Sequence, residues 1–232
     1  MGIPVERYSK ITDKNNREIC LLRAFPCAWG KCTFCDYIED NGHDEAAMIS
    51  LNKSILDQVT GEFGVLEVIN SGSCFELPKQ TLDDIENVIK TKNIHKLFFE
   101  SHWMYRKHLA AMRSRMPVPI IFKIGVETFD SDFREHVLIK HADFQSPEEV
   151  AEYFDSPCLM VGIKGQTKEM IAHDIDCLKR YFKLGTVNVY NNNTTPIKRD
   201  EELVRWFMKE YNWLLDDPSV EVLYDITDFG VG

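Results

Sequence analysis

Apolar runs, several of them rich in β-branched residues, alternate along this chain with segments whose apolar residues recur at helical spacing. The runs predict strands at residues 18–24, 65–70, 96–100, 119–128, 158–163, 186–191 and 220–226. The periodic segments predict helices near residues 45–59, 79–92, 104–115, 130–139, 146–154, 168–183 and 199–216. Residues 1–16 are polar and predict a surface lead-in.

Strands that alternate with helices of this length indicate right-handed βαβ units and a parallel sheet. The number of units predicts an α/β fold, a partial (β/α)6 TIM-like barrel with an extra C-terminal strand. No linker or low-complexity stretch interrupts the chain, so we expect a single domain over residues 1–232, with a core at about 18–195 and a C-terminal cap and strand at about 196–232. Ligands of such a barrel collect at the carboxyl ends of the strands.

The bulk composition places the chain among soluble globular proteins. It has 232 residues, 44% of them hydrophobic and 28% charged. It contains no long apolar run and no leader-like segment at its start, so we expect it in the cytoplasm, with no membrane partner. Seven cysteines, an odd number with three clustered, fit a reducing compartment and a metal site better than a disulfide framework.

The formal net charge of −10 disfavours a nucleic-acid partner. Proteins that bind nucleic acids usually show a basic excess or a basic stripe. Short basic groups occur, as at Arg106-Lys107-His108, but these are typical of solvated helix faces. A small-molecule substrate is therefore favoured over a folded RNA.

Candidate chemistry is concentrated directly after the first predicted strand. Cys27, Cys32 and Cys35 have C-x4-C-x2-C spacing, which allows one tight turn to aim the last two thiolates at a single centre. Three thiolates suit a [4Fe–4S] cluster with one open iron. A structural zinc ion normally takes four ligands, and His43 could supply the fourth. Simple buried thiols remain a third reading of the motif.

The order of motifs at the strand ends resembles that of the radical S-adenosylmethionine (radical SAM) superfamily. The cysteine loop, with the aromatic Phe34 before its last cysteine, has one residue more than the usual C-x3-C-x2-C spacing. Ser71-Gly72-Ser73 stands where Gly-Gly-Glu is common, as in the elongator-like and coproporphyrinogen-oxidase-like branches. Similar segments of those branches match Gly125-Val-Glu127-Thr128 and Gly162-Ile-Lys-Gly-Gln-Thr167. The resemblance covers roughly residues 18–195.

This resemblance implies two cofactors, a [4Fe–4S] cluster held by Cys27, Cys32 and Cys35, and S-adenosylmethionine (SAM) on its open iron. It implies that the SAM contacts include Glu127, whose carboxylate would accept hydrogen bonds from the ribose hydroxyls; a pair with Lys123 is the alternative. The further SAM contacts would be Phe34, Ser71, Gly72, Ser73 and Asn188. An electron donor such as flavodoxin or ferredoxin would be a partner.

The substrate is harder to derive from the sequence. A chain this short has no room for an auxiliary-cluster, cobalamin-binding or RNA-binding appendage, and it resembles small members of the superfamily that cleave a C–N bond of a free 7-deazaguanine base. A guanine-like edge requires a carboxylate acceptor and aromatic stacking partners. The candidate substrate contacts are Asp36, Tyr37, His102, Tyr190, Asp225, Asp228 and Phe229. Two alternatives stay open, a radical enzyme that modifies tRNA or a peptide, and a non-catalytic zinc protein.

Overall fold

The computed structural model describes residues 6–224. Within these residues the strands are hydrogen-bonded neighbours in chain order, from β1 to β8. Strand β1 runs antiparallel to β2. The pairs β2–β3, β3–β4, β5–β6, β6–β7 and β7–β8 are parallel. The bounds are β1 Tyr8–Ile11, β2 Arg17–Leu22, β3 Val65–Asn70, β4 Lys96–Glu100, β5 Ile120–Glu127, β6 Ser156–Val161, β7 Gly185–Val189 and β8 Val220–Leu223.

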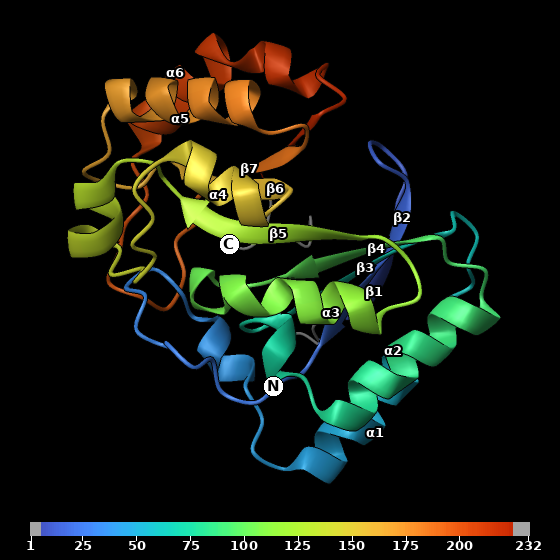
Figure 1. Ribbon diagram of the computed structural model, residues 1–232. Helices are drawn as coiled ribbons and strands as arrows, with labels where there is room; N and C mark the ends of the chain where they lie inside the picture. Colours follow the sequence, from blue (N-terminus) through green and yellow to red (C-terminus); the bar gives the residue numbers. More distant parts are fainter. Residues whose placement is uncertain (1–5, 225–232) are drawn as a thin grey trace. The chain divides into compact units, whose positions relative to one another are not determined.

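Helices occupy the connections between the strands (Figure 1). The α-helices are α1 Glu45–Leu56, α2 Lys79–Thr91, α3 Leu109–Arg115, α4 Pro147–Tyr153, α5 Lys168–Tyr181 and α6 Glu201–Glu210. Shorter elements are the 3₁₀ helices η1 Tyr37–Asp40, η2 Cys74–Glu76, η3 Trp103–His108 and η5 Asn212–Leu215, and the π-helical turn η4 Phe133–Val137. The α/β fold and the partial barrel with an extra C-terminal strand are thereby confirmed.

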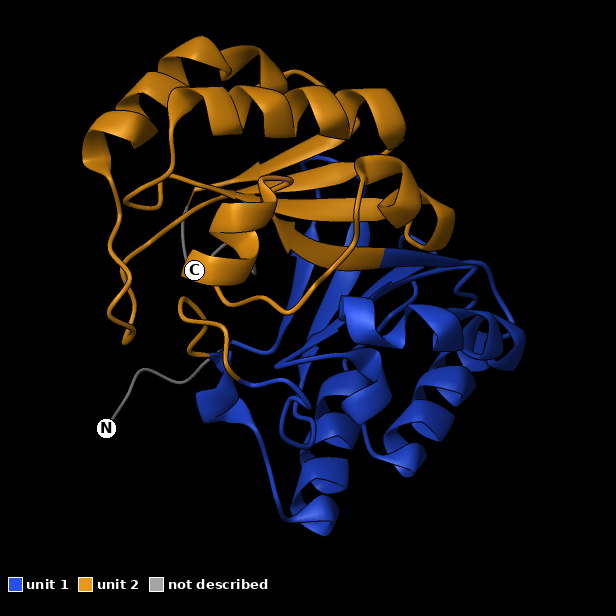
Figure 2. Cartoon of the chain, turned by 60° about the vertical axis from the view of Figure 1, so that its left-hand side comes forward, with its two compact units in different colours: residues 1–30, 37–122 blue, residues 31–36, 123–232 orange. Residues whose placement is uncertain are grey.

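The chain divides into two compact units (Figure 2). Unit 1 consists of residues 1–30 and 37–122, and unit 2 of residues 31–36 and 123–232. Strand β5 begins in unit 1 and continues in unit 2. The single domain expected from the sequence stays a prediction.

Unit 1 is built on the parallel strands β2, β3 and β4, which are mostly buried. Helix α2 presents Leu82, Ile85 and Ile89 to the interior at helical spacing, and it lies beside α1 (Figure 1). Helix α1 starts at Asp44, whose carboxylate accepts the Ala47 N–H as an N-cap. This packing fixes the loops that follow the carboxyl ends of the three strands.

Unit 2, like unit 1, combines buried strands with helices that are capped at their N-termini. Strand β6 is buried along its whole length, as expected for a strand covered on both faces. The N-caps of α4, α5 and α6 are Ser146, Thr167 and Asp200, and the side chain of each accepts a backbone N–H of the first turn. Pro147 occupies the first turn of α4, as the sequence predicts.

One strand was missed, and three expected helices were wrong. Residues 8–11 form strand β1, where the sequence predicts only a surface lead-in; the strand is polar, and Tyr8 Oη donates to Glu18 Oε1 across the pair. The single helices expected at 104–115 and 199–216 are each a 3₁₀ turn joined to a shorter α-helix. The helix expected at 130–139 is the π-turn η4.

No helix within residues 6–224 is both long and apolar enough to cross a membrane.

Candidate functional site

Glu76 ties the carboxyl-end loops of unit 1 together. Its Oε1 accepts hydrogen bonds from the Ala28 backbone N–H at 2.8 Å and from the Tyr105 hydroxyl at 3.1 Å. Its Oε2 accepts the Ser73 N–H, and Ser73 in turn caps η2, so the two residues form a capping box. One buried carboxylate thus joins the loops after β2, β3 and β4.

Asn41 makes a second link in the same unit. Its Oδ1 accepts the Cys27 N–H at 3.2 Å. Its Nδ2 donates to the Ser71 carbonyl oxygen at 2.9 Å and to Ser71 Oγ at 2.6 Å. Cys27 and the expected SAM-binding segment Ser71–Ser73 therefore lie close together within unit 1.

The Ser71–Ser73 segment is a turn that requires glycine at its centre. Gly72 has φ +154°, and a Cβ there would overlap Glu76 Oε2. The same Cβ would contact Cys27 Cβ at 3.4 Å. The absent side chain leaves the backbone open to a close approach beside Cys27, which is what a segment that binds a small charged ligand needs.

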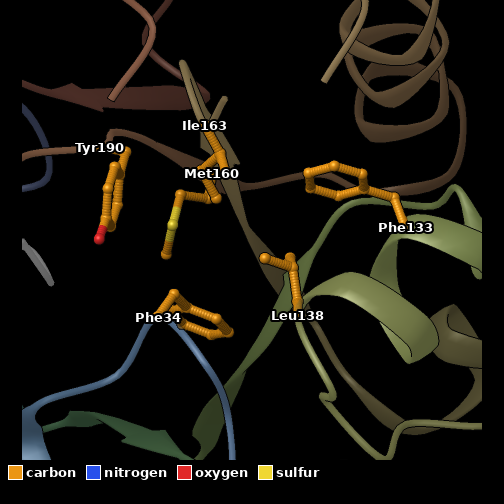
Figure 3. Close-up of a cluster of buried hydrophobic side chains, with 6 residues drawn as sticks. All are labelled: Phe34, Phe133, Leu138, Met160, Ile163 and Tyr190. Atoms are coloured by element: carbon orange, nitrogen blue, oxygen red, sulfur yellow. The ribbon is translucent and has the colours of Figure 1, made fainter. Parts of the chain in front are cut away.

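In unit 2 the second half of the cysteine loop packs on a hydrophobic cluster. Phe34, Phe133, Leu138, Met160, Ile163 and Tyr190 form this cluster, and Figure 3 shows Met160 extending between Tyr190 and Leu138. Cys32 and Cys35 pack against it on either side of Phe34 in the sequence, and the Cys35 N–H donates to the Cys32 carbonyl at 3.4 Å. The tight turn expected between these two cysteines is therefore present.

Two further hydrogen-bonded links hold the loop. The Thr33 N–H donates to the Leu138 carbonyl at 3.0 Å, and Thr33 Oγ1 donates to the Val137 carbonyl at 2.7 Å. Asn193 Nδ2 donates to the Phe34 carbonyl at 2.8 Å. The segments after η4 and after β7 thereby fix the backbone around Phe34.

Glu127 ends β5 and forms a buried ion pair with Lys140. Lys140 Nζ donates to Glu127 Oε1 at 2.5 Å, and both side chains are nearly inaccessible to solvent. Burial lowers the pKa of Lys140, but the negative charges of Glu127, Cys32 and Cys35 outweigh it, and the net shift of the pKa is upward. Gly125 makes room for the pair, because a Cβ there would overlap Glu127 Oε1 and Lys140 Nζ.

Asn188 and Tyr190 follow one another on one face of β7 and its extension. Both are buried, and Asn188 Oδ1 has no hydrogen-bond partner within the described residues. A buried acceptor without a donor fits a ligand that brings one. The Tyr190 hydroxyl contacts the Asn193–Ile197 loop, and its ring is part of the hydrophobic cluster, so this placement is that of a core side chain.

Asp36, Tyr37 and His102 are the other expected substrate contacts that the structure describes. Asp36 Oδ2 accepts long hydrogen bonds from the Thr194 N–H at 3.4 Å and from the Thr194 hydroxyl at 3.5 Å. His102 Nδ1 caps η3 by accepting the Met104 N–H at 3.2 Å. Tyr37 begins η1 and is half-buried. Substrate binding by these residues stays a prediction, and Asp225, Asp228 and Phe229 lie outside the described residues.

The donor chemistry of the three loop cysteines fits a thiolate-held cluster. Cys27, Cys32 and Cys35 are partly accessible, whereas Cys20, Cys74, Cys158 and Cys177 are buried. Burial raises the pKa of Cys20 to about 12, that of Cys177 to about 11, and that of Cys74 as well, which keeps these thiols protonated. Lys140, by contrast, places a positive charge near Cys32 and Cys35.

Residues 6–224 contain no group of three His, Cys, Asp or Glu side chains already arranged around a metal position. Cys27 belongs to unit 1, and Cys32 and Cys35 belong to unit 2. His43, the alternative fourth ligand for zinc, is exposed in unit 1. The assignment of the cysteines as metal ligands stays a prediction.

Sequence reasoning missed several residues that build these loops, namely Asn41, Glu76, Tyr105, Lys140 and Asn193. Only Glu76 carried a local signal, because Ser-x-x-Glu at 73–76 is the pattern of a capping box. The others act across long sequence separations, such as the 159 residues between Asn193 and Phe34. No spacing rule identifies such partners.

Comparison with solved structures found an enzyme that is similar to this chain over nearly its full length. The chain is similar to queuine lyase from Clostridium spiroforme bound to SAM and queuine, with 53% sequence identity and a TM-score of 0.95 over 98% of this chain and 99% of that chain. Two structures of the radical SAM methyltransferase TsrM from Kitasatospora setae match at 12% identity, with TM-scores of 0.42 and 0.41 over 73% and 72% of this chain. They cover 35% and 33% of the TsrM chains. No family model and no curated protein sequence matches the chain.

Proposed function

Because this chain belongs to the queuine lyase family of radical SAM enzymes, we propose that it cleaves queuine to 7-aminomethyl-7-deazaguanine. The observation that supports this most strongly is the similarity to queuine lyase over nearly the full length of both chains. The reaction would break a C–N bond after hydrogen abstraction from the cyclopentenediol part of queuine.

Cys27, Cys32 and Cys35 would hold a [4Fe–4S] cluster, with SAM as the second cofactor. When bound, the cluster supplies the electron that cleaves SAM to methionine and a 5′-deoxyadenosyl radical. Asn41 and Glu76 would hold the backbone at Cys27 and Ala28 in place. Thr33 and Asn193 would do the same for the loop around Phe34.

SAM would be bound by residues at several strand ends. The Ser71–Ser73 turn offers backbone groups next to Cys27, and Phe34 lies next to Cys35 in the sequence. Glu127 would accept hydrogen bonds from the ribose hydroxyls, since an ionised carboxylate is an acceptor. Asn188 Oδ1, buried and without a donor in the described chain, would accept one from SAM.

Queuine would be recognised by a carboxylate at the guanine-like edge and by aromatic side chains at its faces. The candidates are Asp36, Tyr37, His102, Tyr190, Asp225, Asp228 and Phe229. An external electron donor such as flavodoxin or ferredoxin would reduce the cluster. We place the reaction in the cytoplasm, where thiols stay reduced.

The test is anaerobic reconstitution with iron and sulfide, followed by incubation with SAM, a reductant and queuine. Mass spectrometry should detect 5′-deoxyadenosine together with 7-aminomethyl-7-deazaguanine. Cys32→Ser should abolish both products. Cys158→Ser is the matched control, because Cys158 is buried in β6 outside the loop, and it should retain both products.

Formation of 5′-deoxyadenosine without the aminomethyl product would keep the radical chemistry and discard queuine as the substrate. A tRNA or peptide substrate would then be tried in its place. A colourless protein with stoichiometric zinc and no 5′-deoxyadenosine would overturn the proposal entirely.

A further inference from the structure

Lys140 lies in unit 2 beside the Glu127 carboxylate and the ring of Phe34. Its Nζ donates to Glu127 Oε1 at 2.5 Å and lies 5.4 Å from the centre of the Phe34 ring. Phe34 is flanked in the sequence by Cys32 and Cys35, which pack against the same hydrophobic cluster. The negative charges of Glu127, Cys32 and Cys35 all contribute to the raised pKa of Lys140. The ammonium group of Lys140 thus interacts with Glu127, whose carboxylate is expected to bind SAM, and its charge interacts with Cys32 and Cys35, which are expected to bind the cluster.

The backbone around this pair adopts conformations that L-residues avoid. Glu127 has φ 64°, and Ile139 and His141, on either side of Lys140, have φ 51° and 54°. Left-handed conformations of non-glycine residues carry a cost and are concentrated at functional sites. The strained positions meet at the Glu127–Lys140 pair.

The buried side chain of Arg134 holds these strained positions in place. Arg134 Nε donates to the Ala142 carbonyl at 3.0 Å, and its guanidinium also donates to the Thr128 carbonyl at 3.2 Å. The Lys140 N–H donates to the Arg134 carbonyl at 3.0 Å. Arg134 therefore binds both the backbone that follows Glu127 and the backbone around Lys140.

Stability alone does not account for such a pair. Two buried charges lose their hydration, and replacing a buried ion pair with apolar side chains is often neutral or stabilising. A glycine at position 125 is also required to accommodate it. The pair, the strained backbone and the two adjacent thiols together indicate a role in the chemistry.

On the basis of the function proposed above, we propose that Lys140 is a positioning residue with two effects. Its ammonium group fixes the Glu127 carboxylate in the orientation that receives SAM. Its positive charge, 5.4 Å from the ring of Phe34 in the cysteine loop, stabilises the reduced cluster and so raises the reduction potential of that cluster. Hydrogen bonds and charges near the sulfurs set such potentials.

The test is a redox titration of the reconstituted protein without SAM. Electron paramagnetic resonance measures the fraction of reduced cluster at each potential. Lys140→Met removes a positive charge and should lower the potential. Glu127→Gln removes the neighbouring negative charge and should raise it. Opposite shifts are the signature of charge, because mere loosening of the site would move both variants in the same direction.

Two further variants complete the set. Lys140→Arg keeps the charge and should leave the potential closer to wild type than Lys140→Met does. Lys179→Met is the matched control, because Lys179 also forms an ion pair in unit 2, with Asp217 at 2.6 Å. That lysine donates to Ser219, which precedes β8 at its amino end, so its loss should leave the potential unchanged.

SAM binding gives a second measurement. Without Lys140 the Glu127 carboxylate is free to turn away, so Lys140→Met should weaken SAM binding about tenfold, the equivalent of one charged hydrogen bond. Lys179→Met should bind SAM as the wild type does.

Equal potentials for wild type, Lys140→Met and Glu127→Gln would overturn the proposal, as would a shift of the same sign in both variants. Failure of the proposed function is a separate outcome. It would show as a wild-type protein that holds a cluster and binds SAM but does not convert queuine, whatever the potentials of the variants are.

Discussion

Glu76 illustrates how one buried carboxylate organises the loops of unit 1. It accepts hydrogen bonds from the N–H groups of Ala28 and Ser73 and from the Tyr105 hydroxyl. It therefore acts only as an acceptor, a role that an amide side chain cannot reproduce.

Glu76→Gln should lower the free energy of unfolding by about 1–3 kcal/mol, because one buried N–H loses its acceptor and faces an amide donor. Tyr105→Phe removes one hydrogen bond without that conflict and should cost about 1 kcal/mol or less. Urea unfolding of the metal-free protein measures both. A Glu76→Gln protein as stable as Tyr105→Phe would contradict the assigned role.

Asp174 is a second buried carboxyl group, on α5. Its Oδ1 accepts the Phe129 N–H at 2.6 Å, two residues after Glu127, and it is fully buried. Burial raises the pKa of Asp174 from 3.8 to about 7; Asp130 adds to the shift, whereas Arg134 and hydrogen bonds from Phe129 and Thr128 oppose it. The folded state therefore binds this proton more tightly than the unfolded state does.

Because of that tighter binding, this group's contribution to stability is present below about pH 4 and is lost as the pH rises to about 7. Asp174→Asn removes the titration. Between about pH 5 and about pH 8 the variant should therefore lose less unfolding free energy than the wild type. Urea unfolding at the two pH values checks this, and equal losses in the two proteins would refute it.

At the scale of elements, the sequence pattern was sufficient to predict those strands and helices that their own local sequence determines. The buried runs at 65–70 and 96–100 coincide with β3 and β4, and the Ser146-Pro147 start of α4 is present. Strand β1 was missed because Tyr8–Ile11 is short and polar, and it forms only by pairing with β2. Its existence depends on a partner strand, not on its own sequence.

The segment 130–139 shows the other reason for failure. Its apolar spacing predicts an α-helix, but the structure has a π-turn followed by left-handed residues at 139 and 141. Thr33, 104 residues from Val137 in the sequence, imposes this path from a distance, and the Glu127–Lys140 pair and the hydrogen bonds of Arg134 hold it at shorter range. The candidate site follows the same rule, since the cysteine motif was visible in the sequence and the residues that hold it were not.

The cost of that path can be measured at Ile139. A β-branched residue at φ 51° is strained, whereas Asn enters the left-handed region more easily. Ile139 is 39% exposed, so little burial is lost on substitution. Ile139→Asn should raise the free energy of unfolding by about 1 kcal/mol.

Val137→Asn is the matched control, because Val137 is equally exposed but lies within η4 without a positive φ. This variant should show no gain in thermal or urea unfolding. If Ile139→Asn were no more stable than Val137→Asn, the left-handed backbone would not be a source of strain.

At the scale of the whole molecule, the loop cysteines are distributed over both compact units. Cys27 belongs to unit 1, and Cys32 and Cys35 belong to unit 2. A centre that requires all three thiolates does not exist in the unfolded chain, so its binding free energy adds to folding free energy. Loading with metal is therefore expected to act on the stability of the chain as a whole.

We expect the reconstituted holoprotein to unfold at a higher temperature than the metal-free protein, and saturating SAM to raise that temperature further, since SAM binds the folded state. Cys27→Ser and Cys32→Ser should each abolish the difference between the two forms. Cys158→Ser should lower both temperatures and keep the difference, because Cys158 lies buried in β6. Anaerobic calorimetry measures all four proteins. If Cys27→Ser retained the full difference, the cluster would not be held by the three loop cysteines together, and the role of Cys27 would have to be reassigned.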